Sequence, residues 1–384
     1  MLFLRIYRKI LRLIGYFLFN FFKINEKLII FQSEGDFWDN ARALYEYMIQ
    51  NHYNDKYKMI WLVENPNLYK RHIRKNVVFI NYNSFSFKNI LLETFYLKTA
   101  KYMFFTHRGF IQRRKNQVVI ELWHGSIPMK KMETPPTIWK QFDFQVCPSW
   151  NAAKRMSLFT GVKENQVIIC GDCRQDLLFE DCESKIKNFL KLKDETFVLV
   201  MPTFKKSKNW QDGKILPYIF PMVSSQKELE DLNNFCIKNN IKIVIKVHHL
   251  DDTTYIKQLN FSHLVVLKDE DLQNSDIQLY ELVGKSDALI SDFSSIVYDY
   301  MLLNKPIGFM LTEKESYKRG FIVDNIENEM FGDKIYTLED LSNFLLSIKL
   351  GNNKFETEKI DLINHFFDNK KNGNCKNLIK TLGL

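Results

Sequence analysis

Several short segments of this 384-residue chain combine imidazole, basic or hydroxyl side chains with turn residues. The first reads ELWHGSIPMKK and places His124 directly after an apolar run, followed by Gly125 and Ser126. An imidazole exchanges a proton near neutral pH, so His124 is a candidate general base. Lys130 and Lys131 follow and can neutralise phosphate. The competing interpretation is a structural histidine that caps a turn.

A second segment, IKIVIKVHH, brings Lys246, His248 and His249 to the end of another apolar run. Adjacent residues on a strand point to opposite faces, so the two histidines are poorly placed to share one metal ion. We therefore expect no metal here. Contact with an anion and a purely structural role both remain open.

The third segment, DALISDFSSI, carries Asp292, Ser294 and Ser295 where a strand gives way to a helix. The free N–H groups of a helix start, together with two hydroxyls, can hold a phosphate. A plain serine N-cap is the alternative interpretation.

Two more segments combine charges with tight turns. GDCRQD carries Arg174 and Asp176, which either pair to shape a hinge or contact a substrate. MPTFKK carries Thr203 and Lys205 at the mouth of a strand, where they either hold an anion or form a solvated turn. The sequence contains no P-loop, G-x-G-x-x-G, H-E-x-x-H or paired-carboxylate motif.

The elements that must position these segments follow from alternating short apolar and longer amphipathic runs. Such alternation predicts parallel sheets wrapped by helices. A charged run over residues 180–195 divides the alternation into two series, so we expect two doubly wound domains facing a cleft at the carboxyl ends of their strands. The expected strands are KLIIFQS, KMIWLV, NVVFIN, YMFFT, QVVIEL, FDFQVCPS and QVIICGD, then TFVLVMPTF, IKIVIKVHH, HLVVLKD, DALISD and PIGFM.

Composition restricts the class of protein. The chain is 46% hydrophobic and 26% charged, and its 14 glycines and 9 prolines are too few for a fibrous or low-complexity protein. A net charge of +9 favours an anionic partner. Nucleic acid is disfavoured because the basic residues are scattered and no nucleic-acid-binding module is present. Six cysteines with a single C-x-x-C fit reduced thiols and a cytoplasmic location.

Residues 1–23 are expected to form a separate amphipathic helix. The uncharged run over residues 13–22 is too short to span a bilayer, and no cleavage site of a signal peptide follows it. A basic helix lying in a membrane interface is the favoured interpretation, and a helix packed on the protein's own core is the alternative. The basic residues that share one helical face are Arg5, Arg8, Lys9 and Arg12.

Taken in order, these segments resemble the CDP-glycerol glycerophosphotransferase family, which comprises teichoic-acid primases and polymerases with capsule relatives. The family patterns are W-H-G-T-P-x-K-K, G-Y-P-R-N-D, A-P-T-[FW]-R, R-x-H-P and D-x-L-I-[ST]-D-[YF]-S-S, followed by F-D and K-P. A late segment with Arg319, Gly320 and Phe321 resembles the family's R-G-[FY] motif. The resemblance spans about residues 27 to 380. Lys205 and Lys246 stand where the family usually has arginine.

The resemblance implies a fold of the glycosyltransferase-B type and transfer of glycerol phosphate from CDP-glycerol to an acceptor hydroxyl, with release of CMP. It implies His124 as general base and His248 as a second catalytic residue at the pyrophosphate. We expect no cofactor and no bound metal, and an effect of divalent ions stays open. The residues expected to bind the donor or its phosphates are Thr203, Lys205, Lys246, Asp292, Ser294, Ser295 and Arg319. The residues expected at the acceptor or elsewhere in the cleft are Gly125, Ser126, Lys130, Lys131, Arg174 and Asp176.

The expected domains are the helix of residues 1–23, an acceptor domain over 24–190 and a donor-binding domain over 191–384, whose last helix crosses back. The expected location is peripheral, on the cytoplasmic face of the membrane. The expected partners are CDP-glycerol or a related CDP-polyol, a glycan or lipid-linked acceptor, and an anionic membrane surface. The alternatives are a CDP-ribitol-dependent transferase, a glycosyltransferase using a nucleotide sugar, and a polyanion-binding protein without catalysis.

Overall fold

The computed structural model describes residues 2–107, 113–125, 127–131, 138–203, 218–247, 261–312 and 320–384. The chain divides into two compact units. Unit 1 comprises Met1–Ser126, Pro136–Asp176 and Gly373–Leu384, and unit 2 comprises Ile127–Pro135 and Leu177–Asn372. Each unit is built on its own parallel sheet, so the predicted α/β class is confirmed.

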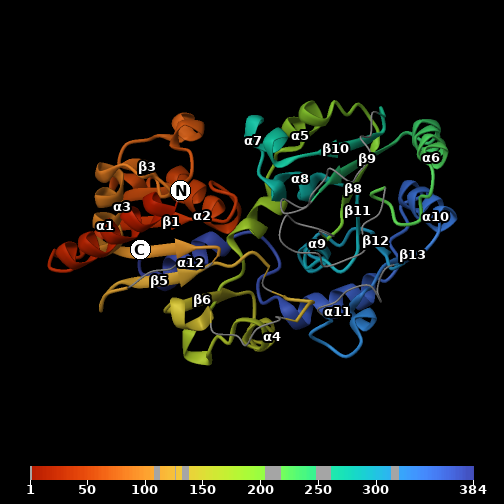
Figure 1. The fold of residues 1–384 in the computed structure, drawn as a ribbon. Helices are drawn as coiled ribbons and strands as arrows, with labels where there is room; N and C mark the ends of the chain where they lie inside the picture. The colour runs from red at the N-terminus through yellow and green to blue at the C-terminus, as the bar shows by residue number, and fades with distance from the viewer. Residues whose placement is uncertain are drawn as a thin grey trace. The chain divides into compact units, whose positions relative to one another are not determined.

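Unit 1 contains a seven-stranded sheet in the order β3-β2-β1-β4-β5-β6-β7, with every pair parallel (Figure 1). The strand order runs outward in both directions from β1 and β4, which is the doubly wound arrangement. The expected strands of the first series are all present. Their bounds are β1 Asn25–Gln32, β2 Lys58–Val63, β3 Val77–Asn81, β4 Ala100–Phe105, β5 Val118–Glu121, β6 Phe144–Cys147 and β7 Val167–Ile169.

The core of unit 1 is unusually aromatic. Phe31 of β1 stacks between Trp61 of β2 and Phe104 of β4, at ring-centroid distances of 5.4 and 5.3 Å. All three rings are fully buried, which fixes the register of the central strands. The helices of this unit are α1 Leu2–Phe19, α2 Asp39–Gln50, α3 Phe87–Thr99, α4 Trp150–Thr160 and α12 Asn374–Leu382, with 3-10 turns at Tyr53–Asp55, Pro66–His72, Ile138–Gln141 and Glu164–Gln166. A further 3-10 turn, Cys173–Phe179, begins in unit 1 and ends in unit 2.

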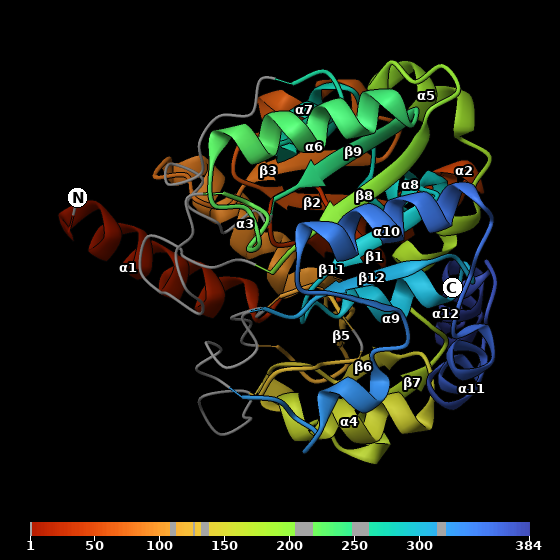
Figure 2. The ribbon, with the colours of Figure 1, turned by 90° about the vertical axis from the view of Figure 1, so that its right-hand side faces the viewer.

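Unit 2 contains a six-stranded parallel sheet in the order β10-β9-β8-β11-β12-β13. Figure 2 shows α6 and α10 lying across one face of this sheet, and their apolar side chains join those of β8, β9 and β11 in one core. The strands are β8 Thr196–Met201, β9 Ile241–Lys246, β10 Leu264–Leu267, β11 Ala288–Ser291, β12 Ile307–Met310 and β13 Asp333–Ile335. The helices are α5 Glu183–Leu190, α6 Gln226–Lys238, α7 Asp269–Asn274, α8 Leu279–Lys285, α9 Ile296–Met301, α10 Leu338–Lys349 and α11 Glu356–Phe366, with a 3-10 turn at Ile326–Glu329.

The division between the two units does not fall within the charged run of residues 180–195. The sequence placed the boundary at residues 190/191, whereas the chain passes from unit 1 to unit 2 after Asp176. The charged run contains α5, which buries Ile186 and Leu190 and holds Glu281 of α8 through Lys185 at 2.8 Å. We took this run for a division between domains because the exposed side of α5 is charged, although the other side of the helix is buried in unit 2.

Helix α1 packs on α3 through its polar side. Arg8 and Arg12 lie 3.3 and 3.4 Å from the carboxylate of Glu93, which is buried in α3. Gly15 permits the close approach, because a Cβ there would meet Oγ1 of Thr94 at 2.4 Å. We expected Arg5, Arg8, Lys9 and Arg12 on a membrane-facing basic surface, and the structure turns Arg8 and Arg12 toward the protein.

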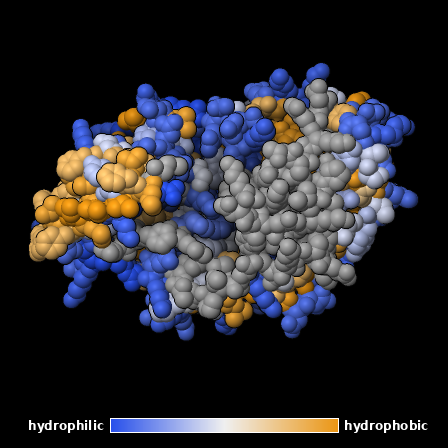
Figure 3. Space-filling view, in the orientation of Figure 1, coloured by the Kyte–Doolittle hydropathy of each residue, from blue (hydrophilic) through white to orange (hydrophobic). Residues whose placement is uncertain are grey.

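The apolar side of α1 and the turn after it is correspondingly exposed. In Figure 3 these residues form a continuous hydrophobic surface over unit 1. Within the part of the chain that the structure describes, no helix is both long and apolar enough to cross a membrane. The exposed apolar residues are Leu2, Phe3, Leu4, Ile6, Ile10, Leu13, Ile14, Phe17, Leu18, Phe21 and Phe22.

Candidate active site

His124 lies just beyond the carboxyl end of β5, where the sequence predicted it. The preceding residue, Trp123, has a φ of +55°, a left-handed conformation that is costly for a bulky residue. Its N–H donates to the carboxyl of Glu121 at 3.0 Å, and its carbonyl accepts from Nδ2 of Asn40 at 2.9 Å. The backbone that presents His124 is thus held on both sides.

The hydrogen bond of the imidazole assigns its tautomer. Nδ1 of His124 lies 3.1 Å from the carbonyl oxygen of Thr106. A carbonyl can only accept, so a neutral ring carries its proton on Nδ1 and leaves the lone pair on Nε2. Nε2 is the atom that can take a proton from a substrate hydroxyl. The rings of Trp123 and His124 also stack, with centroids 4.6 Å apart, which restricts rotation of the imidazole.

Two residues that the sequence analysis did not select lie beside His124. Glu34 follows β1, and His107 follows β4. Among the described residues, Glu34, His107 and His124 are the group of His, Cys, Asp or Glu side chains placed to share a metal ion, with one ligand atom of each within 4.8 Å of the others. The signal that could have found them was available, because each directly follows an apolar strand, as His124 does.

Glu121 is fully buried beneath this edge of the sheet. Desolvation raises the pKa of its carboxyl to about 8, and the hydrogen bond from the Trp123 N–H opposes that shift only partly. Its neighbour across the ladder is Gln145 of β6, also buried. The carboxyl therefore supports the turn from below rather than reaching a substrate.

Arg174 and Asp176 serve different elements rather than each other. The backbone N–H of Arg174 donates to Oδ1 of Asn40 at 2.9 Å, and its guanidinium pairs with Asp39 at 2.9 Å. Because Asn40 also holds the carbonyl of Trp123, Arg174 supports the His124 turn indirectly.

The carboxylate of Asp176 accepts three backbone N–H groups at the start of α12, at 2.8, 2.8 and 3.0 Å. Of the two interpretations left open for Asp176, a structural role and a substrate contact, these hydrogen bonds favour the structural one, as a cap of α12. Burial raises the pKa of the Asp176 carboxyl, and the three backbone hydrogen bonds oppose that rise.

In unit 2, the carboxyl edge of the sheet is held by a buried clamp between β8 and β11. Asp292 accepts the N–H of Thr203 at 2.9 Å and its hydroxyl at 2.8 Å. The hydroxyl of Ser291 donates to the carbonyl of Met201 at 2.6 Å in the same pair of strands. The expected donor-site residues Thr203 and Asp292 thus lie together, and these contacts tie them to each other.

Lys246 is also engaged within the protein. Its ammonium lies 2.8 Å from the carboxylate of Asp269 and donates to the carbonyl of Val247 at 2.7 Å. Its side chain is only 5% exposed. The resemblance implied that Lys246 contacts phosphate. In the structure its ammonium neutralises the carboxylate of Asp269 at the start of α7.

Ser294 and Ser295 precede α9 and are partly exposed. Ser295 occupies the N-cap position without a side-chain capping bond, so its hydroxyl is not used in the way a plain N-cap serine would be. Phe293, the residue before them, packs on Phe321 with ring centroids 4.8 Å apart. The predicted serine segment is thereby connected to the late R-G-F segment.

The lysines that follow His124 in the chain belong to unit 2. Lys130 forms an antiparallel bridge with Phe321, and the N–H of Lys131 donates to the carbonyl of Gly320 at 3.2 Å. We expected them in the acceptor domain, but they lie with the segment that packs on Phe293. Four other predicted site residues, Ser126, Lys205, His248 and Arg319, lie outside the described residues.

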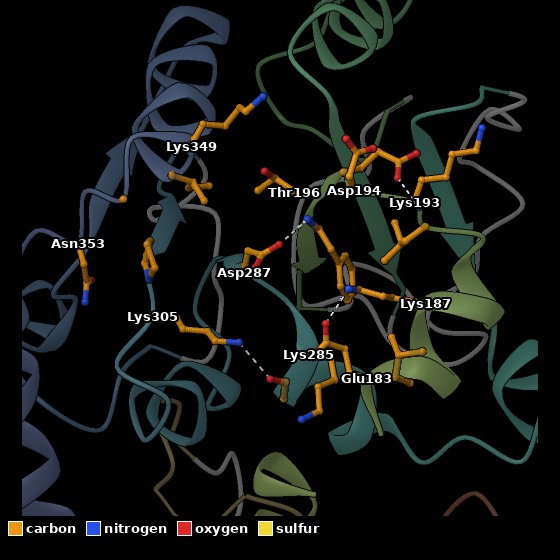
Figure 4. Close-up of a pocket in the computed structure, with 18 residues that line it drawn as sticks. Glu183, Lys187, Lys193, Asp194, Thr196, Lys285, Asp287, Lys305, Lys349 and Asn353 are labelled. Carbon is orange, nitrogen blue, oxygen red and sulfur yellow. Dashed lines mark hydrogen bonds and ion pairs between the residues drawn. The ribbon is translucent and has the colours of Figure 1, made fainter. Parts of the chain in front are cut away.

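A pocket of about 710 Å³, lined by both charged and apolar residues, lies at the opposite, amino edge of the unit 2 sheet. Figure 4 shows lysine and acidic side chains around it, including Lys187, Lys285 and Asp287. It is lined by the start of β8 and by the residues that precede β11 and β12. None of the predicted site residues line it, and ligands of doubly wound sheets bind at the carboxyl ends instead.

Comparison with solved structures supports the fold. A structure of the wall teichoic acid polymerase TagF matches 99% of this chain and 93% of its own, with a TM-score of 0.75 and 20% sequence identity. Together with the two doubly wound sheets, this similarity defines the chain as an α/β protein of the glycosyltransferase-B type.

Sequence comparison is more specific. Residues 14–382 match the family described as CDP-glycerol:poly(glycerophosphate) glycerophosphotransferase, and the chain belongs to this family of transferases. A teichoic acid poly(glycerol phosphate) polymerase of Bacillus spizizenii is 28% identical, over 84% of this chain and 83% of its own. A teichoic acid glycerol-phosphate primase of Bacillus subtilis is 24% identical, over 89% of each chain. A ribitol-phosphate primase of Bacillus spizizenii is 23% identical, over 54% of each chain. The resemblance noted in the sequence is thus confirmed.

Proposed function

We propose that this protein transfers glycerol phosphate from CDP-glycerol to a hydroxyl group of a teichoic or capsular glycan acceptor, with His124 as the general base. The observation that carries the proposal is the hydrogen bond from Nδ1 of His124 to the Thr106 carbonyl, which leaves Nε2 with a lone pair at the carboxyl edge of the sheet. Membership of the glycerophosphotransferase family supports the choice of donor.

The reaction needs a base more than an acid. The acceptor oxygen bonds to the phosphorus that carries glycerol while the P–O bond to CMP breaks. CMP departs with the bonding electron pair and is a good leaving group, and Nε2 of His124 receives the proton of the acceptor hydroxyl. The product is a phosphodiester between the glycerol and the acceptor.

Unit 2 is the proposed donor-binding part. The partly exposed Ser294 and Ser295 support this assignment, because their hydroxyls lie at the carboxyl edge of β11 where phosphates bind in such sheets. We assign the Thr203–Asp292 clamp to shaping that edge. His248, Lys205 and Arg319 stay in the proposal as phosphate contacts on the family resemblance alone.

The test is release of CMP from CDP-glycerol by the purified protein, with CDP-ribitol and a panel of UDP-sugars in parallel, over purified membrane lipids and glycans. We expect CMP from CDP-glycerol, rising with one acceptor class. CMP from CDP-ribitol alone would favour the activity named for the ribitol-phosphate primase relative. UDP from one sugar, without CMP, would overturn the proposal in favour of a glycosyltransferase.

The role of His124 has its own test. His124→Ala is expected to reduce turnover by about 10²–10⁴-fold, the usual contribution of a positioned acid–base group. Affinity for CDP-glycerol, measured by calorimetry, should change little because the base acts on the acceptor. Near-normal turnover of this variant would exclude His124 as the base.

We also propose that the protein is peripheral at the cytoplasmic face of the membrane, bound through the apolar side of α1. The support is the exposed row that includes Leu13, Phe17 and Phe21, whose apolar area is favourable to bury in an acyl boundary. Arg8 and Arg12 are engaged with Glu93. Apolar burial, rather than attraction to anionic lipid, therefore supplies most of the proposed binding.

A further inference from the structure

Three strand ends bring three ionisable side chains to one place in unit 1. β1, β4 and β5 are consecutive in the sheet, and the residues paired at their ends include Gln32 with Phe105 and Phe105 with Glu121. Glu34, His107 and His124 each lie two or three residues beyond these paired positions. Adjacent parallel strands end at the same edge of a sheet, so the residues that follow them lie close together. The position of these three side chains is therefore a consequence of the strand order.

Side-chain contacts tighten the group. Nδ1 of His107 lies 3.5 Å from Oε2 of Glu34, and the two side chains are 41% and 31% exposed. The ring of His107 stacks on that of Trp123 at 6.2 Å and lies 5.5 Å from that of His124. One carboxylate oxygen of Glu34 and one nitrogen of each ring lie within 4.8 Å of one another. A negative charge is thus placed beside the imidazole of His124.

Glu34 and His124 are both hydrogen-bonded to Thr106. Its side-chain oxygen accepts the N–H of Glu34 at 3.1 Å, and its carbonyl accepts from Nδ1 of His124. Thr106 is completely buried, so both attachments are fixed by the sheet.

The turn that carries Glu34 is held from its other end as well. The carboxylate of Asp36 accepts the N–H of Glu64 at 2.5 Å and the hydroxyl of Tyr69 at 3.1 Å. The backbone of the turn that carries Glu34 is therefore anchored, and the Glu34 carboxylate does not move with a free surface loop.

We propose that Glu34 is a positioning residue for His124: its carboxylate, steadied by His107, favours the imidazolium that forms when His124 takes the acceptor proton. This inference rests on the proposed function, because it assumes that His124 is the base. An imidazolium beside a carboxylate is stabilised relative to the neutral ring. The carboxylate remains ionised and takes up no proton in the step.

The contacts of the described residues connect several charged or titratable side chains to His124 or to the turn that carries it. Glu34 follows β1, His107 follows β4, and the buried Glu121 lies in β5. The Asp39–Arg174 pair at the start of α2 is connected to the turn through Asn40. Of these, Glu34 is the partly exposed carboxylate within 4.8 Å of an imidazole nitrogen of the group.

The experiment compares Glu34→Gln and Glu34→Asp with the wild type and with Glu26→Gln as matched control. Glu26 lies at the amino end of β1, the strand that Glu34 follows, and pairs with Lys101 at 3.3 Å. Each protein is assayed for CMP release from CDP-glycerol across pH 5–9 at saturating donor and acceptor. The pH profile, kcat and the donor KM are compared, and circular dichroism reports folding.

We expect Glu34→Gln to lower kcat about tenfold or more and to move the acidic limb of the pH profile to lower pH, because the imidazolium loses a neighbouring negative charge. The donor KM should stay unchanged. Glu34→Asp, which keeps the charge, should recover part of kcat and the position of the limb. Glu26→Gln should match the wild type.

Three outcomes would overturn the inference. Glu34→Gln could show the wild-type kcat and pH profile. It could lower kcat without moving the acidic limb, which would indicate packing alone. Chelation could abolish wild-type activity and Zn²⁺ or Mn²⁺ restore it, with Glu34→Gln losing metal binding, in which case the group is a metal site. An inactive wild type, or a fully active His124→Ala, would instead refute the proposed function.

Discussion

Glu121 holds Trp123: its buried carboxyl accepts the tryptophan N–H at 3.0 Å and so supports the left-handed residue that precedes His124. Burial raises the pKa of this carboxyl from its ordinary value of 4.5 to about 8. Between those values the unfolded chain releases the proton and the folded chain keeps it. The free energy of unfolding therefore falls as the pH rises through this window, and the loss is complete above about pH 8.

Glu121→Gln should remove this pH dependence. The amide oxygen can still accept the Trp123 N–H, and the side chain carries no proton to lose. We expect the thermal midpoint of the variant to match or exceed that of the wild type at pH 8, with the difference shrinking toward pH 5. A variant that is equally less stable at every pH would contradict the raised pKa of Glu121, because the wild type would then show no pH dependence for the amide to remove.

The inward arginines of α1 predict salt-resistant binding to membranes. Leu13→Asp together with Phe17→Asp should release the protein from vesicles in flotation assays while leaving turnover on a soluble acceptor intact. Binding of the wild type to neutral phosphatidylcholine vesicles should persist at 0.5 M salt, where exposed charges are strongly screened. Leu158→Asp is the matched control, since Leu158 is 65% exposed on α4, away from the α1 surface. Release of the wild type by salt would point back to a basic contact surface.

Asp176 predicts a defect in stability rather than in substrate binding. Asp176→Ala leaves three N–H groups at the start of α12 without their acceptor, and loss of a cap typically costs about 0.5–2 kcal/mol. We expect a lower thermal midpoint with the KM values for donor and acceptor unchanged. A normal midpoint with a raised acceptor KM would return Asp176 to the substrate site.

In unit 2, the hydrogen bonds between Thr203 and Asp292 likewise predict a defect in stability rather than in substrate binding. Asp292→Ala leaves the buried N–H and hydroxyl of Thr203 without their acceptor, at a cost of about 1–3 kcal/mol for a buried polar group. Thr203→Val removes only the hydroxyl and should be milder. Weaker binding of CDP-glycerol at unchanged stability, measured by calorimetry, would instead indicate direct contact between Asp292 and the donor.

Much of the fold could be predicted because strand periodicity is strong in this sequence. Each expected strand in both series forms, and His124 follows β5 as anticipated. No residue range was predicted from the sequence for helices α3 and α4, although α3 provides Glu93 to α1. The division of the units after Asp176 was not predicted, because a charged helix surface carries no information about which core the opposite surface joins.

The candidate site was harder to predict because sequence spacing does not reveal pairing. Lys246 resembled a free cation, but its partner Asp269 lies 23 residues further on. Glu34 and His107 were missed because they are isolated residues of common types, and only the strand order brings them beside His124. For residues that follow a buried strand, their position at the edge of the sheet predicts membership of the site better than a sequence motif does.

The segmented construction of unit 1 has a consequence for synthesis on the ribosome. A nascent chain that has reached Asn372 contains every residue of unit 2, but unit 1 still lacks residues 373–384. Asp176 and the buried thiol of Cys173 must wait for α12 to cover them. Unit 2, although encoded later, is therefore the first of the two that can mature completely, and the unit that carries His124 is finished last.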